Sequence, residues 1–169
     1  MPVFLRTLLF TILVPGSATV GIPYLILTLH PVTMWFDLGP LRYGGVIPIL
    51  AGAITYLWCA WDFTFTGKGT PAIWDPPKMF VANGLYRAVR NPMYLGIVLI
   101  LAGEALVFRS WTLLAYAVVA WTGFHLFVIY YEEPTLKKKF GTSYESYLRT
   151  VPRWMPKAPN PLAKRAANS

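Results

Sequence analysis

Long apolar stretches alternate with short polar segments along the chain. A helix that crosses a bilayer needs roughly 20 apolar residues. Four stretches approach that length, and they cover residues 4–29, 44–61, 92–108 and 111–131. This pattern predicts an all-α integral membrane protein with about four transmembrane helices.

Prolines and polar residues mark where these helices bend and end. The Pro15-Gly16 pair and Pro23 lie inside the first stretch and predict kinks in its helix. Pro92 begins the third stretch, in a helix position where its missing N–H would be unpaired anyway. Since only Arg109-Ser110 separates the third stretch from the fourth, we expect these two helices to form an antiparallel hairpin.

The first stretch has a second interpretation, as a cleaved signal peptide. Arg6 precedes an apolar run, and the small residues Gly16, Ser17 and Ala18 follow it. The apolar run nevertheless continues over 24–29, where a mature domain would begin. A transmembrane helix is therefore the favoured interpretation.

The composition requires lipid contact over much of the surface. Of the 169 residues, 56% are hydrophobic and seven are acidic, too few for the charged shell of a soluble domain. The net charge of +8 would suggest nucleic acid in a soluble protein. Here the basic residues flank apolar stretches and can meet anionic lipid headgroups, so we expect membrane lipids and no nucleic acid as partners. A single cysteine, Cys59, excludes an intramolecular disulfide and a thiolate cluster, and we expect no metal.

The basic residues also predict the orientation in the membrane. Arg42 and Arg109 lie on one side of the predicted helices. The other side carries the basic residues of the middle loop and the tail, namely Lys68, Lys78, Arg87, Arg90, Lys137, Lys138, Lys139, Arg149, Arg153, Lys157, Lys164 and Arg165. The positive-inside rule then places both termini in the cytosol. We expect a multi-pass protein of a bacterial-type inner membrane or a plasma membrane.

The chain is short enough for one domain, which we place at residues 1–157. The remainder, 158–169, is rich in alanine, proline and lysine and is expected to be a disordered tail with no packed core. The segment 67–77 is rich in glycine and proline, and is interpreted either as a lid or as a rigid connector.

Polar residues collect in two places, around 83–96 and around 132–154. With equal rise along both arms of the predicted hairpin, Glu132 and Glu133 fall level with Tyr86 and Arg87. By the same count His125 falls level with Tyr94. Carboxylates, arginines and aromatic rings at one cytosolic mouth could hold a zwitterionic ligand with a flat ring.

Each of these residues also has a purely structural interpretation. Arg87 and Arg90 could be positive-inside anchors, and Tyr86 and Tyr94 interfacial aromatics. His125 could be a hydrogen-bonded packing residue, and Lys137 to Lys139 lipid-facing charge. Glu132 and Glu133 could cap the fourth helix, although acids at a helix C-terminus oppose its dipole.

Glu104 is a separate case because it lies inside the third stretch, away from the mouth. An acid within a span is costly and needs a partner or a water-filled cavity. It is a candidate for a substrate-path or catalytic residue, or for a protonated side chain hydrogen-bonded between helices.

The motifs of the second half resemble a known superfamily. They run Gly84-x-Tyr86-x-x-x-Arg90-Asn91-Pro92-x-Tyr94-x-Gly96, then Glu132-Glu133-x-x-Leu136, Phe140-Gly141-x-x-Tyr144-x-x-Tyr147 and Val151-Pro152-Arg153. This order is similar to that of the isoprenylcysteine carboxyl methyltransferases and phospholipid methyltransferases. The resemblance covers about residues 83–156, and the N-terminal half carries no such motif.

The resemblance implies S-adenosylmethionine as methyl donor, bound by residues of about 83–156. The cofactor-binding residues carried over from it are Tyr86, Arg90, Asn91, Tyr94, Gly96, Glu132 and Glu133, with His125 added from the register. Many members have histidine where this chain has Asn91, which can hydrogen-bond but cannot titrate near neutrality. His125 could compensate.

The expected reaction is methyl transfer to a lipophilic acceptor in the membrane, either a prenyl-cysteine-like carboxylate or a phospholipid amine. A carboxylate needs an orienting cation, for which Arg90 and Arg153 are the candidates. An amine needs deprotonation, by a glutamate or by His125. Two alternatives stay open: an NADPH-dependent sterol or enone reductase, using Lys68, Lys78 and 137–139 for the extra phosphate, and a non-catalytic scaffold or transport subunit.

Overall fold

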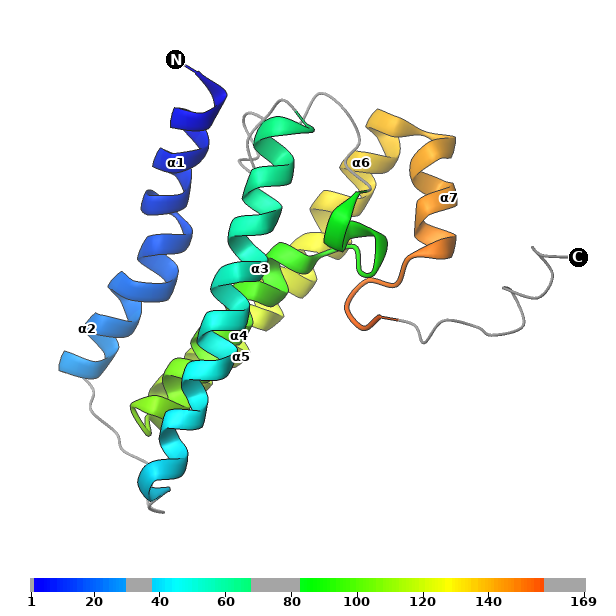
Figure 1. Ribbon diagram of the computed structural model, residues 1–169. Helices are drawn as coiled ribbons and strands as arrows, with labels where there is room; N and C mark the ends of the chain where they lie inside the picture. The colour runs from blue at the N-terminus through cyan, green and yellow to red at the C-terminus, as the bar shows by residue number, and fades with distance from the viewer. Residues whose placement is uncertain (1, 30–37, 68–82, 157–169) are drawn as a thin grey trace, which may run out of the picture.

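The computed structural model describes residues 2–29, 38–67 and 83–156, and these ranges are helical, with no β-strand among them. The predictions that fall on 68–82 and 157–169, among them Lys68, Lys78 and the tail, lie outside the described residues. In the view of Figure 1 the chain descends through the first helix, ascends through α3, descends through α4 and ascends again through α5. The all-α prediction is confirmed.

The first helix is a single rod with an irregular middle. It consists of α1 (Val3–Leu13), the π-helical turn η1 (Ser17–Gly21) and α2 (Ile22–Leu29). The irregular turn follows the Pro15-Gly16 pair that the sequence marks as a kink. A proline cannot donate the helical hydrogen bond of its own position, and the wider π turn accommodates the interruption.

Among the described residues three helices are long and apolar enough to cross a membrane: Val3–Leu29, Gly39–Phe65 and Trp111–Phe140. The second combines the 3₁₀ turn η2 (Gly39–Gly45) with α3 (Val46–Phe65). The third predicted span forms α4 (Pro92–Val107), whose 16 residues are shorter than the others. At 1.5 Å per residue it extends about 24 Å, less than the ~30 Å of a hydrocarbon core. The protein is thus an integral membrane protein with three long apolar helices and one shorter one.

The fourth predicted span continues well beyond its expected end at 131. It comprises α5 (Trp111–Phe127), the π-helical turn η4 (Val128–Glu132) and α6 (Glu133–Phe140). The helix ends at Gly141, whose φ of +56° favours glycine. Glu132 and Glu133 therefore lie within a helix, and the expectation that they sit at a helix C-terminus was wrong. A last helix, α7 (Thr142–Thr150), turns back beside α6.

The closest backbone approach at a glycine in the described part of the chain is a seam between α3 and α4. Gly45 faces Gly103, and Gly52 faces Gly96. The two glycines on each helix are seven residues apart in the sequence, about two helical turns. A Cβ atom added at Gly52 would lie 2.3 Å from the carbonyl oxygen of Gly96, and one at Gly45 would lie 2.5 Å from that of Gly103. Such distances leave no room for any side chain. Small residues let membrane helices approach closely in this way, so the seam fixes α4 against α3.

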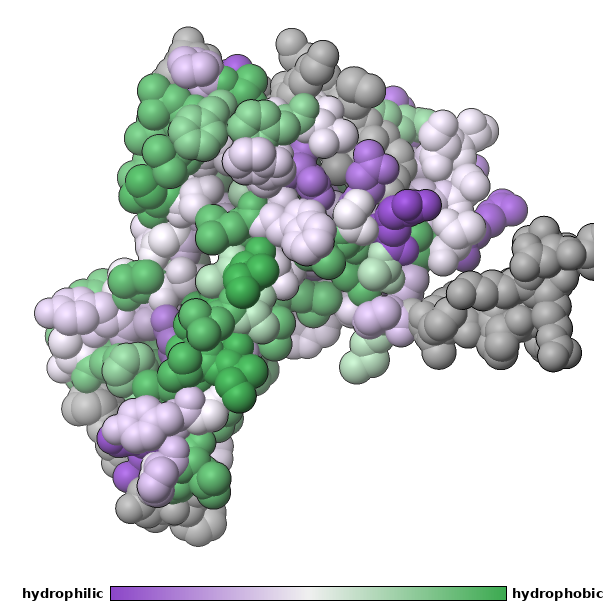
Figure 2. All heavy atoms as spheres, viewed as in Figure 1, coloured by the Kyte–Doolittle hydropathy of each residue, from purple (hydrophilic) through white to green (hydrophobic). Residues whose placement is uncertain are grey.

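Polar contacts tie the first helix to the others only at intervals. Thr64 donates to Thr7 at 2.9 Å, and the phenol of Tyr116 donates to the carbonyl of Ala18 at 3.0 Å. Between these contacts lies an apolar crevice of about 180 Å³, bounded by the first helix, α3 and α4. Figure 2 shows apolar side chains covering the first helix and α3, while hydrophilic ones gather around α6 and α7.

Candidate functional site

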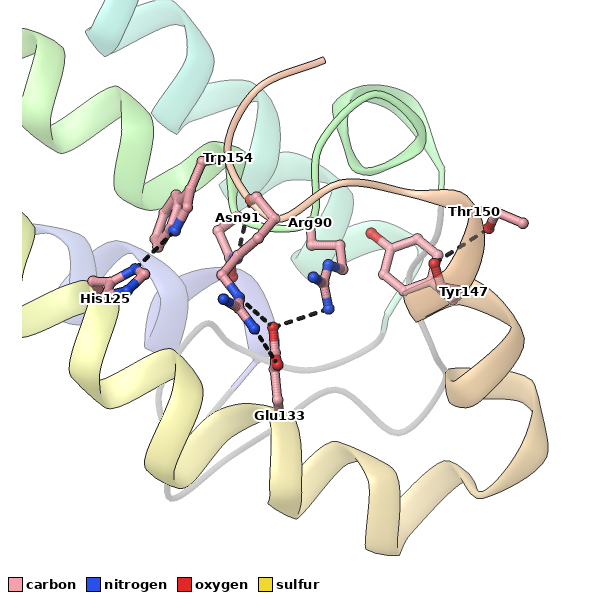
Figure 3. A network of polar contacts seen from close by, with 8 residues as sticks. Arg90, Asn91, His125, Glu133, Tyr147, Thr150 and Trp154 are labelled. Carbon is pink, nitrogen blue, oxygen red and sulfur yellow. Dashed lines mark hydrogen bonds and ion pairs between the residues drawn. The ribbon is translucent and has the colours of Figure 1, made fainter. Parts of the chain in front are cut away.

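A polar mouth forms where four segments meet: the loop 83–91, the first turn of α4, the end of α5 with α6, and residues 151–156. We call the last of these the C-terminal strap. It follows α7 and returns across the start of α4 toward α5 (Figure 3). The polar mouth therefore combines residues that lie far apart in the sequence, such as Arg90 and Arg153.

Glycine and an extended residue shape the loop that enters α4. Gly84 has a φ of +56°, and a Cβ there would lie 2.6 Å from Oδ2 of Asp62 on α3. Both the backbone conformation and the close approach require glycine. The 3₁₀ turn η3 (Gly84–Arg87) then buries Tyr86, whose ring contacts Phe63 edge-on at 5.5 Å. Burial raises the pKa of Tyr86 well above its usual value, so this phenol stays protonated.

Glu133 is the centre of the polar mouth. Arg153 donates from Nε to Oε1 at 2.7 Å and from its terminal nitrogen to Oε2 at 2.9 Å, a two-pronged arrangement. Arg90 adds a third contact to Oε1 at 2.9 Å (Figure 3). The side chains of Arg90 and Glu133 are only 12% and 16% exposed. These hydrogen bonds raise the pKa of Arg153 further, and two cations thus enclose one largely buried carboxylate.

Glu132 has a different partner. The phenol of Tyr94 donates to its Oε2 at 2.9 Å, and the ring of Tyr94 stacks on Phe124 at 4.8 Å. The equal-rise count placed Glu132 and Glu133 level with Tyr86 and Arg87, about two turns along the chain from Tyr94. The count gives the approximate depth but not the hydrogen-bond partner, because 83–91 is not an α-helix and η4 is π-helical, so residues per turn differ on the two arms.

The C-terminal strap is held by backbone as well as side-chain contacts. The N–H of Arg90 donates to the carbonyl of Pro152 at 2.9 Å, and Nδ2 of Asn91 donates to the carbonyl of Arg153 at 3.2 Å. The indole N–H of Trp154 donates to Nδ1 of His125 at 3.0 Å. Asn91 and His125 thus both hold the strap, which the sequence did not indicate.

Two tyrosines of α7 close the polar mouth from the outside. The Tyr147 phenol donates to the carbonyl of Tyr86 at 2.7 Å, and Tyr144 is 3% exposed. Burial is the main reason that both phenols have a pKa above the usual value. Both residues stand in the motif quoted above, but only the structure shows that Tyr147 bonds to η3 and that the ring of Tyr144 lies 6.0 Å from that of Tyr147.

Three sequence candidates do not join this cluster. Gly96 lies in the α3–α4 seam, where its space is filled by the backbone of α3. Glu104 lies three turns along α4 from the mouth, with its Oε2 buried and without a partner among the described residues. Arg87 is exposed.

Two further polar atoms at the polar mouth are buried and have no hydrogen-bond partner in the described part of the chain: Nε of Arg90 and Oδ2 of Asp62. One is a donor and the other an acceptor, and unpaired buried groups of this kind are costly. Sequence reasoning missed Asp62 as a member of the site, and it placed Tyr147 and Trp154 in the polar segment 132–154 without giving them a role. A charged residue at the end of α3 was the only available signal for Asp62. Among the described residues no group of His, Cys, Asp and Glu is arranged to hold a metal.

Two comparisons with known proteins bear on this site. A family model described as phospholipid methyltransferase matches residues 41–143, which include the α3–α4 seam, Tyr94, Glu132 and Glu133. The chain is also 35% identical over 77 residues to Protein-S-isoprenylcysteine O-methyltransferase B of Arabidopsis thaliana. That match covers 45% of this chain and 39% of the plant protein, so the chain spans well under half of this relative.

Proposed function

The chain belongs to the phospholipid methyltransferase family, and from that premise we propose that it transfers a methyl group from S-adenosylmethionine to a lipophilic acceptor in the membrane. The observation that carries the proposal is the polar mouth itself, where Arg90, Glu132 and Glu133 converge beside stacked aromatic rings. A scaffold has no need of such a cluster. Neither comparison supports the reductase or scaffold alternative.

The side chains at the polar mouth fit the polar groups of the methyl donor. Its methionine part carries a carboxylate and an ammonium. The buried, unpartnered Nε–H of Arg90 is a donor suited to a carboxylate, and Glu132 and Asp62 supply carboxylate oxygens for an ammonium, while Glu133 is held by Arg90 and Arg153. Tyr94 and Phe124 offer flat apolar faces for a purine. When bound, the donor supplies an electrophilic methyl group on a sulfonium.

The protein's task in such a transfer is alignment and exclusion of water, because the sulfonium loses its charge as it reacts. The C-terminal strap and the Tyr144–Tyr147 pair cover the polar mouth and keep Arg90 and Glu133 largely from solvent. Glu133 in turn fixes both guanidinium groups. The geometry therefore favours a preorganised, water-poor site.

The acceptor is either a prenyl-cysteine-like carboxylate or a phospholipid amine. For a carboxylate, Arg90 or Arg153 is the orienting cation, and Arg90 retains a free N–H for it. For an amine, Glu132 or His125 is the group that takes the proton. Because Nδ1 of His125 accepts from Trp154, its proton lies on Nε2, and His125 could act as a base only after that contact opens.

The orientation belongs to the same proposal. The polar mouth, with the basic helix α6 beside it, faces the cytosol, and both termini lie on that side. The acceptor enters sideways from the bilayer. Glu104 is proposed as a residue of the acceptor's path, and normal turnover in Glu104→Gln would rule out this role.

The proposal is tested by titrating the detergent-purified protein with S-adenosylhomocysteine and, separately, with NADPH in a calorimeter. We expect binding of the first and no binding of the second. The variants Arg90→Ala and Glu133→Ala should lose that binding while remaining folded. Binding of NADPH alone would favour the reductase, and parental affinity in both variants would refute the assigned pocket.

A further inference from the structure

The C-terminal strap is tethered at three successive residues, and the last tether differs from the others. Pro152 and Arg153 are bound by residues at the start of α4 and by Glu133, all within the polar mouth. Trp154 instead reaches α5, where it donates to His125 and packs edge-on against Trp121 at 4.6 Å. This contact fastens the end of the strap on the far side of the polar mouth (Figure 3).

The hydrogen bond between Trp154 and His125 fixes which atom donates and which accepts. An indole nitrogen can only donate, so Nδ1 of His125 must be an unprotonated acceptor. Trp121 lies edge-on against the imidazole at 5.3 Å as well as against Trp154, which limits the orientations of both rings. His125 is thereby committed to the strap in this arrangement and is not available as a cofactor ligand through that nitrogen.

We propose that the Trp154–His125 hydrogen bond anchors the C-terminal strap over the cofactor site, which makes Trp154 and His125 positioning residues. Arg153 lies between this anchor and the backbone contacts of Pro152, so its backbone is held on both sides. A long side chain held in this way loses less conformational freedom when it pairs with Glu133. The part of the inference that concerns the cofactor rests on the proposed function.

The anchor also controls access. Arg90 and Glu133 are largely covered, and a ligand can reach them only if the covering segments move. A strap fastened at one end only would open more often, and a bound ligand would leave faster. Trp154 and His125 are therefore expected to affect retention of the cofactor rather than affinity for the lipid acceptor.

The anchor is tested first without any ligand, by hydrogen exchange and mass spectrometry. The reporters are the strap and the amide of Arg90, which donates to Pro152. Trp154→Phe keeps the ring but removes the N–H, and it should accelerate exchange of these amides about three- to tenfold, the effect of one lost neutral hydrogen bond. Trp61→Phe, on an exposed ring that contacts Phe65, is the matched control and should change nothing there.

Two replacements of His125 separate the hydrogen bond from ring packing. Both remove the imidazole, but His125→Asn keeps an acceptor near the position of Nδ1, whereas His125→Gln places it one bond further out. In His125→Asn we expect the amides of the strap and of Arg90 to exchange nearly as slowly as in the parent protein. In His125→Gln we expect them to exchange as fast as in Trp154→Phe. A role in packing alone would make the two histidine variants alike.

The cofactor part is tested by the dissociation rate of S-adenosylhomocysteine in the same variants. Trp154→Phe should raise this rate about three- to tenfold, in line with the lost hydrogen bond, and leave the KM for the lipid acceptor unchanged. Unchanged exchange in Trp154→Phe would overturn the anchor. Faster exchange with unchanged dissociation would overturn closure over the cofactor. Absence of binding by the parent protein would refute the proposed function, while the exchange data would still decide the anchor.

Discussion

The α3–α4 seam and the polar mouth are held together by opposite means. The seam is made of glycines whose backbones touch, and its specificity comes from the absence of side chains. The polar mouth is made of long side chains, each aimed at a partner by a directed hydrogen bond. The seam leaves no room for an added Cβ, whereas the polar mouth is arranged by side chains from several segments. The comparison shows that backbone contact fixes α3 against α4, while side-chain hydrogen bonds fix the polar mouth.

The largest effect is expected from a side chain added to the seam. Gly52→Leu places a branched side chain where even a Cβ would lie 2.3 Å from the Gly96 carbonyl oxygen, so α3 and α4 must separate. We expect no folded protein by size-exclusion chromatography in detergent. Gly123→Leu on α5, where a Cβ would meet nothing within 4 Å, is the control and should fold. Equal yields of the two variants would show that the seam does not govern folding.

A smaller but still large effect is expected at the centre of the polar mouth. Glu133→Gln keeps the shape but leaves Arg90 and Arg153 facing each other without a counter-charge. Hydrogen bonds to charged groups are worth about 1.5–3 kcal/mol each, so affinity for S-adenosylhomocysteine should fall at least tenfold. Calorimetry measures this loss. Glu145→Gln, which removes only the exposed contact with Lys137, is the control and should bind normally.

The smallest effect is expected from the single hydrogen bond between Tyr94 and Glu132, beside this centre. Tyr94→Phe removes the donor to Glu132 but keeps the ring stacked on Phe124. Only one hydrogen bond to a charged group is lost here, whereas Glu133→Gln weakens three, so affinity for the methyl donor or kcat/KM should fall by about tenfold or less. Steady-state kinetics with labelled S-adenosylmethionine would measure it. Tyr130→Phe, on an exposed phenol, is the control, and parental kinetics in Tyr94→Phe would argue against a role at the site.

The sequence predicted the positions of the membrane helices more accurately than their lengths. Apolar runs located the helices of the four predicted spans, because burial in lipid requires a continuous run of apolar residues, but they gave no indication of the polar helix α7. The end at 131 was too early because Glu132, Glu133 and the lysines of α6 interrupt the apolar run without interrupting the backbone helix. Hydropathy reports where lipid ends, not where a helix ends.

The sequence also indicated which polar residues would gather, but not how they pair. Arg90, Tyr94, Glu132 and Glu133 were all expected at one mouth, and they meet there. Their partners depend on the π-helical turn η4 and on the irregular loop 83–91, and neither has a recognisable sequence signal. One residue of shift along a helix rotates a side chain by about 100°. An equal-rise count cannot predict individual contacts for that reason.

By itself the sequence determined that this chain is a helical membrane protein, which helices are apolar and which motifs carry charge. Those properties follow from local composition, because lipid selects apolar surface wherever it lies along the chain. Only the tertiary structure decided that Gly96 packs on Gly52, that Arg153 and Arg90 share Glu133, and that Trp154 fastens the C-terminal strap to His125. These contacts join residues far apart in the chain. They depend on the close approach of α3 and α4 and on the return of the chain after α7.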